Sequence, residues 1–345
     1  MSSSRLYIFN PDTDMALGSG CHNYTPPASI QAFVARLCLL PALYAEPDSM
    51  LLLPRSMTRL RASDRAYYPI VRRKNIRLVK EEDLVNTSAE VCPWGWDETL
   101  MHRLQRIQGF EAEGVDMSSV CSARRRLSHR RLSIDIHRRL NALLSKSDIA
   151  MPEEFDSLDS LICWAEAHPG CYLKSPWSSS GKGIFHLTDA NRHLLPSWAK
   201  GVIAKQGSVM AEIGEERSLD FATEWVSEHG VVKFKGYSVF EVNDHGGYLG
   251  NILQSESELE QTIRRHAPSF TADHIAALQQ VLTETIAADY EGPLGVDMLA
   301  TTDGRLNLCV EVNLRRTMGH VALDICRQGT TDTIFRPGEP VAFSV

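Results

Sequence analysis

The sequence predicts an α/β protein that opens with a mainly parallel sheet and continues into α+β structure. Three observations carry this prediction. The 345 residues are enough for two or three domains. Residues 5–118 alternate apolar runs typical of buried strands with stretches typical of helices, which indicates an open sheet with helices on its faces. Residues 295–315 hold two apolar runs separated only by a turn, which is typical of an antiparallel hairpin.

The first third of the chain yields four strands and two helices. Strands are predicted at residues 6–10, 50–54 and 76–79 and before Cys92, and helices at residues 29–40 and 97–107. Two polar loops, Asn10-Pro11-Asp12-Thr13-Asp14 and Pro93-Trp94-Gly95-Trp96-Asp97, follow two of these strands. Ligands bind outside the carboxyl ends of strands in open α/β sheets, so both loops are candidates for substrate contact. Turn formation, with Asp97 capping the next helix, explains the same residues equally well.

Residues 119–150 carry a dense arginine run, which could indicate nucleic-acid binding. Apolar residues recur there at helical spacing, which predicts one amphipathic helix capped by Ser128 with most arginines on its solvated face. The run lacks the interleaved aromatic residues of a stacking platform, which disfavours nucleic acid. Arg130 and Arg131, in the first turn, lie where free amides favour an anion. The apolar residues are Leu132, Ile136, Leu140 and Leu143, and the arginines are Arg124, Arg125, Arg126, Arg130, Arg131, Arg138 and Arg139.

A glycine-containing loop follows the strand predicted at residues 171–175, which includes Lys174. The loop reads PWSSSGKGI from Pro176 to Ile184. Small residues let backbone N–H groups approach phosphate oxygens, and Lys174 and Lys182 supply charge. It is not a Walker A loop, because Gly183 stands where Ser or Thr is required, and the HRD and DFG motifs of protein kinases are absent. By itself the loop is also compatible with a surface turn.

The hairpin predicted at residues 295–315 carries acidic groups at metal-ligand spacing. Its turn is Thr301-Thr302-Asp303-Gly304. Asp297 lies on the first strand, and Glu311 and Asn313 leave the same face of the second, roughly 7 Å apart. Mg²⁺ prefers such oxygen ligands together with nucleotide phosphates. The polar face could instead be solvated, but both strands are otherwise apolar, and buried carboxylates are costly unless paired or metal-bound.

Composition is that of an ordinary globular protein with 43% hydrophobic and 23% charged residues. The formal charge of −7 gives no global signal for nucleic acid. No apolar stretch is long enough to span a membrane, and the start lacks the pattern of a secretory signal. Eight cysteines lie scattered without a CxxC pair, which indicates free thiols in the cytoplasm.

Taken in order, these motifs resemble the ATP-grasp superfamily over roughly residues 119–325. The order is the lysine strand, the glycine loop, the segment VMAEIGEERSLDF at residues 209–221, and the Asp…Glu-x-Asn hairpin. The resemblance implies an N-terminal α/β domain (residues 1–118) followed by a two-subdomain ATP-grasp fold (residues 119–206 and 207–345). In that family ATP lies between the two subdomains, under a glycine-rich loop.

The resemblance also implies a role for each candidate residue. Lys174 would contact phosphate or adenine, and Ser180, Gly181, Lys182 and Gly183 would cover the β- and γ-phosphates. Glu212 and Ile213 would bind adenine, Glu216 the ribose, and Asp297, Glu311 and Asn313 would hold Mg²⁺. Arg315 would contact the reacting phosphate or acyl group, and Lys182 would be catalytic with it. Many relatives have a further phosphate-binding lysine upstream, which this chain lacks; the role is assigned to Arg130, with Arg131 as the alternative.

These roles predict an ATP- and Mg²⁺-dependent ligase. It would activate a carboxylate as an acyl-phosphate for attack by an amine or similar nucleophile, releasing ADP and phosphate. An ATP-dependent phosphotransferase and a non-catalytic nucleotide-binding regulatory protein are the alternatives. Arg315 could also be a surface arginine paired with an acid such as Asp324, with Arg316 facing the opposite way. The sequence identifies neither small-molecule substrate and leaves the oligomeric state open, with a homodimer among the options.

Overall fold

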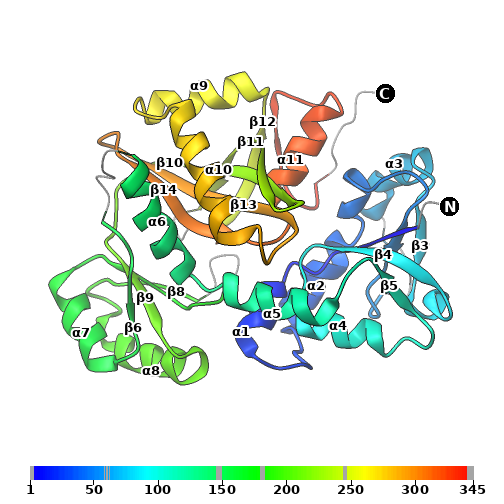
Figure 1. Cartoon of the computed structure of the whole chain (residues 1–345), viewed down its shortest axis with the longest axis horizontal. Coiled ribbons are helices and arrows are strands. Elements are labelled where there is room, and N and C mark those ends of the chain that lie inside the picture. The colour runs from blue at the N-terminus through cyan, green and yellow to red at the C-terminus, as the bar shows by residue number, and fades with distance from the viewer. Residues whose placement is uncertain are drawn as a thin grey trace.

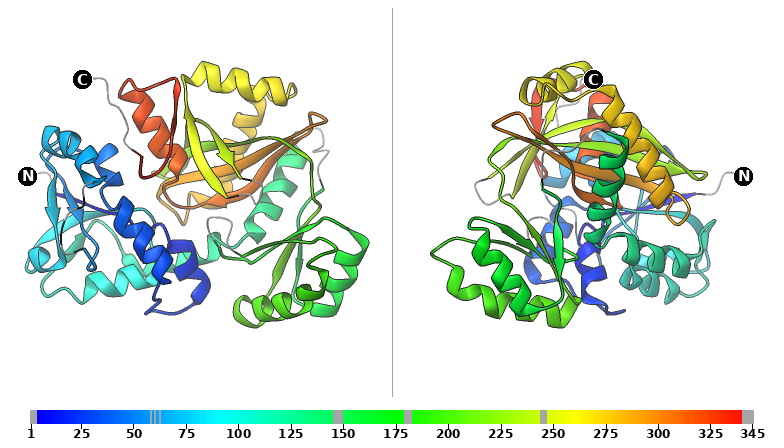
Figure 2. Two further views of the ribbon diagram at one scale, coloured as in Figure 1. Left: turned by 180° about the vertical axis from the view of Figure 1, so that it is seen from behind. Right: turned by 60° about the vertical axis from the view of Figure 1, so that its left-hand side comes forward.

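The computed structural model describes residues 4–57, 59, 61, 63–144, 150–178, 183–243 and 247–339. These residues build three sheets with helices packed against them (Figure 1). In Figure 1 the N-terminal sheet lies on the right, the six-stranded sheet lies at the upper centre, and the four-stranded sheet lies at the lower left; Figure 2 shows the same arrangement from behind.

The N-terminal sheet is parallel throughout, as the sequence predicts. Its strands follow the order β3-β2-β1-β4-β5. The chain builds β2 and β3 on one side of β1 and then returns to build β4 and β5 on the other. The carboxyl ends of β1 and β4 therefore flank a topological switch point, where ligands bind in open α/β sheets. The strands are β1 (Arg5–Ile8), β2 (Met50–Leu52), β3 (Arg77–Val79), β4 (Ser88–Pro93) and β5 (Glu111–Glu113).

Four α-helices accompany this sheet, and the predictions at residues 29–40 and 97–107 correspond to two of them. Asp97 caps one, because its carboxylate accepts a hydrogen bond from the backbone N–H of Leu100 at 2.8 Å. The expectation of a plain loop over residues 10–14 is wrong, since Thr13 and Asp14 already lie in the first turn of a helix. The helices are α1 (Thr13–Ser19), α2 (Ala28–Leu37), α3 (Tyr68–Arg73) and α4 (Glu98–Gln105).

The arginine-rich segment forms two helices, α5 (Met117–Leu127) and α6 (Arg131–Leu143), instead of one. The prediction that Ser128 caps the second helix is wrong, because that helix starts after Arg130 and has no side-chain cap. The backbone N–H of Ser128 continues the pattern of α5 by donating to the carbonyl of Arg124 at 2.8 Å. Most of the arginines are solvated as expected, but Arg124 and Arg130 are buried. Arg124 and Arg130 therefore have partners inside the protein, unlike the solvated arginines of the same segment.

The four-stranded sheet is antiparallel and presents a polar face. Its strands follow the order β6-β9-β7-β8, and two helices cover one side. Leu173 and Ala211 are fully buried on that side. Side chains alternate along a strand, so their neighbours Lys174 and Glu212 leave the other face. The elements are β6 (Glu153–Phe155), α7 (Leu158–Ala167), β7 (Tyr172–Lys174), β8 (Ile184–His186), α8 (Leu195–Gln206) and β9 (Val209–Glu212).

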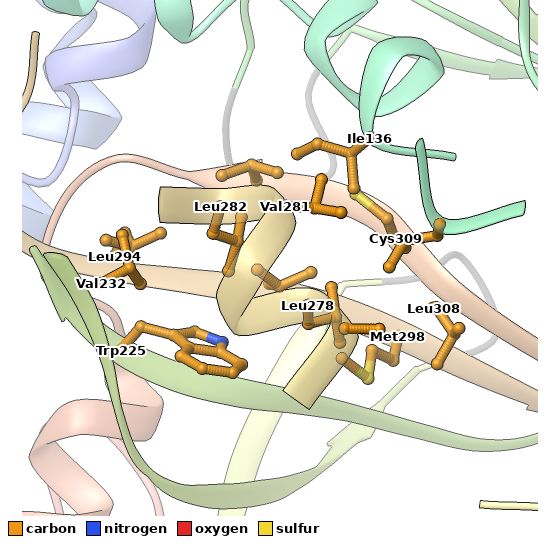
Figure 3. Close-up of a cluster of buried hydrophobic side chains, with 14 of the residues drawn as sticks. Ile136, Trp225, Val232, Leu278, Val281, Leu282, Leu294, Met298, Leu308 and Cys309 are labelled. Atoms are coloured by element: carbon orange, nitrogen blue, oxygen red, sulfur yellow. The ribbon is translucent and has the colours of Figure 1, made fainter. Parts of the chain in front are cut away.

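The six-stranded sheet is also antiparallel, in the order β14-β13-β10-β11-β12-β15. One face packs on α6, α9 and α10 around a core that includes the fully buried Trp225 (Figure 3). On the other face the backbone of Gly319, in α11, lies against Glu224 and Ser238. The elements are β10 (Arg217–Glu228), β11 (Val231–Val242), β12 (Tyr248–Leu253), α9 (Glu256–His266), α10 (Ala272–Ile286), β13 (Gly292–Thr301), β14 (Leu306–Asn313), α11 (Met318–Arg327) and β15 (Thr333–Phe335).

The hairpin that the sequence predicts is formed by β13 and β14. Its turn contains Gly304 at φ +81°, a left-handed conformation that glycine adopts without strain. Asp297 pairs directly with Glu311, and Gly295 pairs with Asn313. The predicted acidic residues therefore share one face of the sheet, the face that the helices of the core leave uncovered.

Candidate active site

The three predicted metal ligands lie together at the end of the β13–β14 hairpin. The amide nitrogen of Asn313 donates to Oδ2 of Asp297 at 3.0 Å. Burial, followed by the neighbouring carboxylates of Glu311 and Glu224, raises the pKa of Asp297 to about 7. A cation placed here would offset the repulsion that raises this pKa. No group of three His, Cys, Asp or Glu side chains suited to a metal exists within the described ranges. The donor set is therefore two carboxylates and one amide, which fits Mg²⁺ with phosphate and water completing its shell.

Arg130 pairs with one of these carboxylates. Its Nη2 lies 2.8 Å from both oxygens of Glu311, and its Nη1 donates at 2.7 Å to the carbonyl of Ser175 and to Oγ of Ser178. The side chain is only 5% exposed, and its Nε has no partner among the residues that the structure describes. Arg131 instead projects to the surface and pairs with Glu154. Of the two arginines that the sequence left open, Arg130 is the one beside the metal-ligand candidates.

Lys174 and Glu212 form an ion pair on the polar face of the four-stranded sheet. Nζ of Lys174 lies 2.5 Å from Oε2 of Glu212, and Lys174 is almost completely buried. Ile213, which follows the end of β9, is 42% exposed. The rings of Tyr172 and His186, on the same face by strand register, stack 4.4 Å apart; sequence reasoning did not single them out. This face offers one flat aromatic surface and one fixed charge pair.

Glu216 has a different neighbour from the other nucleotide-site candidates. Its carboxylate accepts a hydrogen bond from Oγ1 of Thr302 at 3.0 Å, and its carbonyl accepts from the backbone N–H of the same residue. It therefore lies at the tip of the β13–β14 hairpin. Its neighbour Glu215 is held by Arg305, whose Nη2 lies 2.6 Å away. The structure does not join Glu216 directly to Lys174 or Glu212.

The glycine loop is described only at its two ends. Gly183 has φ +76°, and an added Cβ would lie 2.9 Å from Oγ of Ser175 and from Cβ of Ser178, so only glycine fits there. The backbone N–H of Ser175 donates to the carbonyl of Gly183 at 2.8 Å, which closes the base of the loop. Ser180, Gly181 and Lys182 lie outside the described residues, so their roles stay predictions.

Arg315 lies beside the metal-ligand candidates. Its Nη2 donates to Oδ1 of Asn313 at 2.8 Å, and its Nε donates to Oδ2 of Asp14 at 2.6 Å. The alternative pairing of Arg315 with Asp324 is wrong, because Asp324 pairs with Arg316 at 3.0 Å. Arg316 faces away from Asn313, as the sequence predicted, and its guanidinium lies 3.9 Å above the ring of Tyr44.

These contacts make Arg316 a structural link between α11 and the N-terminal region. We expect Arg316→Ala to lower the free energy of unfolding by about 1–2 kcal/mol, the sum of a cation–π contact and a partly exposed ion pair. Chemical denaturation followed by circular dichroism measures this. Arg138→Ala, which removes an exposed ion pair on α6, should cost less than about 0.5 kcal/mol. Equal stability of the two variants would contradict the assignment.

Glu224 is a carboxylate near the site that sequence reasoning missed. It is 1% exposed and accepts hydrogen bonds from Ser238 at 2.9 Å and Thr317 at 2.7 Å, while Nδ1 of His320 lies 2.9 Å away. Burial alone would raise the pKa of Glu224, but His320 and the two hydroxyl donors hold it below its usual range. These contacts anchor the start of α11 to β10. Nothing in its strand sequence distinguishes this glutamate from a solvated one.

The two loops that the sequence selected meet at the carboxyl ends of β1 and β4. The amide nitrogen of Asn10 donates to the carbonyl of Gly95 at 2.6 Å and to Asp97 at 3.2 Å. Burial, followed by the charges of Asp97 and Asp14, raises the pKa of Asp12 to about 6. The Asp14 end of this cluster touches Arg315, so the N-terminal loops border the residues of the C-terminal hairpin.

Comparison with known proteins gives the class of fold. No protein-family model matches the sequence, and no curated protein matches it. Biotin carboxylase from Campylobacter jejuni, in a β,γ-ATP complex, has a TM-score of 0.53 and 12% identity, covering 94% of this chain and 68% of that one. N5-carboxyaminoimidazole synthetase from Staphylococcus aureus, complexed with ADP, has a TM-score of 0.49 and 10% identity, covering 91% of this chain and 71% of that one.

The likeness to biotin carboxylase shows that this chain has the ATP-grasp fold, as its sequence motifs predict. At this identity the likeness concerns the fold alone. No helix within the described ranges has the length and apolar character needed to cross a membrane.

Proposed function

We propose that this protein is an ATP- and Mg²⁺-dependent ligase that joins a carboxylate to an amine or similar nucleophile and releases ADP and phosphate. The observation that carries the proposal is the convergence of Asp297, Glu311 and Asn313 with two arginines, Arg130 and Arg315, in an ATP-grasp fold. Two carboxylates beside two cations suit a metal-bound phosphate whose charge must be offset during transfer. Biotin carboxylase, which shares this fold, was solved as a β,γ-ATP complex, and this supports nucleotide binding in the proposal.

In this proposal each side chain performs a separate part of the reaction. Asp297, Glu311 and Asn313 would hold Mg²⁺, which neutralises phosphate charge when bound. Lys174 and Glu212 would bind the nucleotide on the four-stranded sheet, with Ile213 and Glu216 as further contacts. Arg130 would bind phosphate, and Arg315 would stabilise charge on the transferring phosphoryl or acyl group. The acyl-phosphate formed from the carboxylate must be kept from water until the nucleophile attacks, a role we assign to the loop that contains Lys182.

An ADP-release assay tests the proposed function. The purified protein is supplied with ATP, Mg²⁺ and a panel of amino acids and small carboxylic acids, first singly and then in pairs. A ligase should release ADP with a pair of substrates much faster than with either alone. ADP release that needs only one substrate would indicate a phosphotransferase instead. No Mg²⁺-dependent ADP release and no nucleotide binding would overturn the proposal.

The pairing of Arg130 with Glu311 predicts that phosphate competes with Glu311 for Arg130, and that metal competes with Arg130 for Glu311. Both oxygens of Glu311 already accept from Nη2 of Arg130, so a cation that binds Glu311 and a phosphate that binds Arg130 must each compete with this ion pair. In Arg130→Gln, Glu311 is free, so Mn²⁺ should bind more tightly without nucleotide, by roughly tenfold for one lost charge-assisted pair. ATP should bind more weakly. Titration calorimetry measures both affinities.

Arg131→Gln is the matched control for this prediction, since Arg131 also pairs with a glutamate but at the surface. It should change neither affinity. If Arg130→Gln binds Mn²⁺ and ATP as the unaltered protein does, the ion pair has no part in the nucleotide site.

A further inference from the structure

The N-terminal region contributes one carboxylate, Asp14, that contacts the residues of the hairpin. Asp14 is 8% exposed and lies in the first turn of α1. Its Oδ2 accepts from Nε of Arg315 at 2.6 Å, and its Oδ1 accepts from Nη2 of Arg124 at 3.0 Å. One aspartate thus joins two arginines that lie far apart in the sequence.

Arg124 holds this aspartate from behind. It is completely buried and also donates to Oγ1 of Thr13 and to the carbonyls of Trp96 and Leu314. Two of these acceptors are backbone carbonyls, so the guanidinium has little freedom to turn. An added Cβ at Gly95 would lie 2.8 Å from Nη1 of Arg124, which explains the glycine in the Trp94–Asp97 loop. Both N-terminal loops therefore serve to hold Asp14 in place.

The contacts of Arg315 leave part of its guanidinium free. A guanidinium has five N–H bonds. Nε donates to Asp14, Nη2 to Asn313, and Nη1 to the carbonyl of Arg316 at 3.3 Å. One N–H on each terminal nitrogen has no acceptor among the residues that the structure describes. Two N–H bonds on one planar group match the two oxygens of a carboxylate or phosphate.

Electrostatics support a charged Asp14. Burial alone would raise its pKa, but the charges of Arg315 and Arg124 outweigh burial and hold the pKa below its usual range. Asp14 is therefore ionised at neutral pH. An ionised carboxylate makes the stronger hydrogen bond to a guanidinium and fixes its direction.

We infer that Asp14 is a positioning residue for Arg315, so that the N-terminal domain completes the reaction centre. The inference rests on the proposed function. The long arginine side chain would otherwise sample several rotamers. Because Asp14 orders it before the reaction, its loss of conformational entropy no longer adds to the barrier of the rate-limiting step. Arg315 is then correctly placed only when the N-terminal domain is docked on the hairpin. Through Asp14, the segment that follows β1 is therefore coupled to phosphoryl or acyl transfer.

The kinetic test replaces Asp14 by asparagine, which keeps the shape and removes the charge. We expect kcat for ADP release to fall about 10- to 100-fold, the range found for partners that orient an active-site group. KM for ATP should change less than about threefold, because Asp14 contacts none of the proposed nucleotide ligands. Asp135→Asn is the control, since Asp135 also bonds an arginine but lies exposed on α6. An unchanged kcat in Asp14→Asn would overturn the inference.

A chemical rescue separates positioning from a general structural role. Guanidinium chloride, far below denaturing concentrations, should restore part of the ADP release of Arg315→Gly, because Asp14 can still hold the added cation. The same addition should fail with the double variant Asp14→Asn/Arg315→Gly. Equal rescue of both variants would show that Asp14 does not place the guanidinium.

Failure of the proposed function can be distinguished from failure of this inference. If the unaltered protein releases no ADP with any substrate pair, the proposed function fails. The contact is then judged by thermal unfolding of Asp14→Asn, Arg315→Gln and the double variant. Because the single changes remove the same hydrogen bond, the shifts in Tm should be clearly non-additive. Additive shifts would overturn the inference without any measurement of activity.

Discussion

Replacing Glu311 by glutamine is expected to abolish turnover while the protein stays folded. Glu311 faces Asp297 across the hairpin, and the change removes one of the two carboxylate charges available to a divalent cation. Loss of that charge should reduce ADP release by about 10³-fold or more, since phosphoryl transfer depends on metal and charge stabilisation. The amide keeps the volume of the side chain. Arg130 loses its charged partner but keeps Ser175 and Ser178, so stability should fall by only about 1–3 kcal/mol.

A glutamate–arginine pair of similar exposure, away from the hairpin, is the control for this change. Glu154 is exposed to nearly the same degree as Glu311, 21% against 24% of the side chain, and it pairs with Arg131. Glu154→Gln should leave ADP release unchanged. Circular dichroism shows whether both variants fold, and Mn²⁺ titration shows whether Glu311→Gln alone loses the cation. A Glu311→Gln variant that turns over at the unaltered rate with Mg²⁺ would mean that the metal site is assigned wrongly.

Short sequence patterns were sufficient to predict elements whose formation depends on neighbouring residues alone. The Asp-Gly turn between two apolar runs specified the β13–β14 hairpin, and period-2 alternation placed Glu311 and Asn313 on one face. The same reasoning failed where contacts between distant parts of the sequence determine which side chains are buried. Arg124 is buried because its acceptors come from residues 13, 96 and 314, which no local window contains. Ser128 looked like a helix cap, yet the chain there continues the hydrogen bonding of the preceding helix.

The candidate site shows the same division between local and distant information. Motif order named Lys174, Glu212 and the metal-ligand candidates of the hairpin, and their roles stay predictions. It assigned the upstream phosphate role to Arg130 but kept Arg131 as the alternative, because adjacent residues at a helix start differ only in direction. Tertiary contacts turn Arg130 inward and Arg131 outward. Asp14 was flagged only as part of a polar loop. Its partnership with Arg315, 301 positions later, required the fold itself.

Arg315→Ala should lower kcat by roughly 10²-fold or more, the scale of losing one preorganised charge contact. The guanidinium lies within hydrogen-bond distance of Asn313 and is held from the other side by Asp14. Its two remaining N–H bonds are then available to charge that develops beside the metal-ligand candidates. Affinity for ATP should change far less, because Lys174, Arg130 and Mg²⁺ would still hold the nucleotide. Steady-state ADP release and a nucleotide titration measure the two quantities separately.

Two further variants show which property of Arg315 matters. Arg315→Lys keeps the charge but loses the fork that reaches Asp14 and Asn313 at once, so it should recover only a small part of the lost rate. Arg138→Ala, which removes an exposed arginine from α6, should turn over normally. If the lysine variant is fully active, charge alone is sufficient and the fixed geometry is unnecessary. If Arg315→Ala loses ATP affinity while keeping its kcat, Arg315 binds the nucleotide and takes no part in the transfer step.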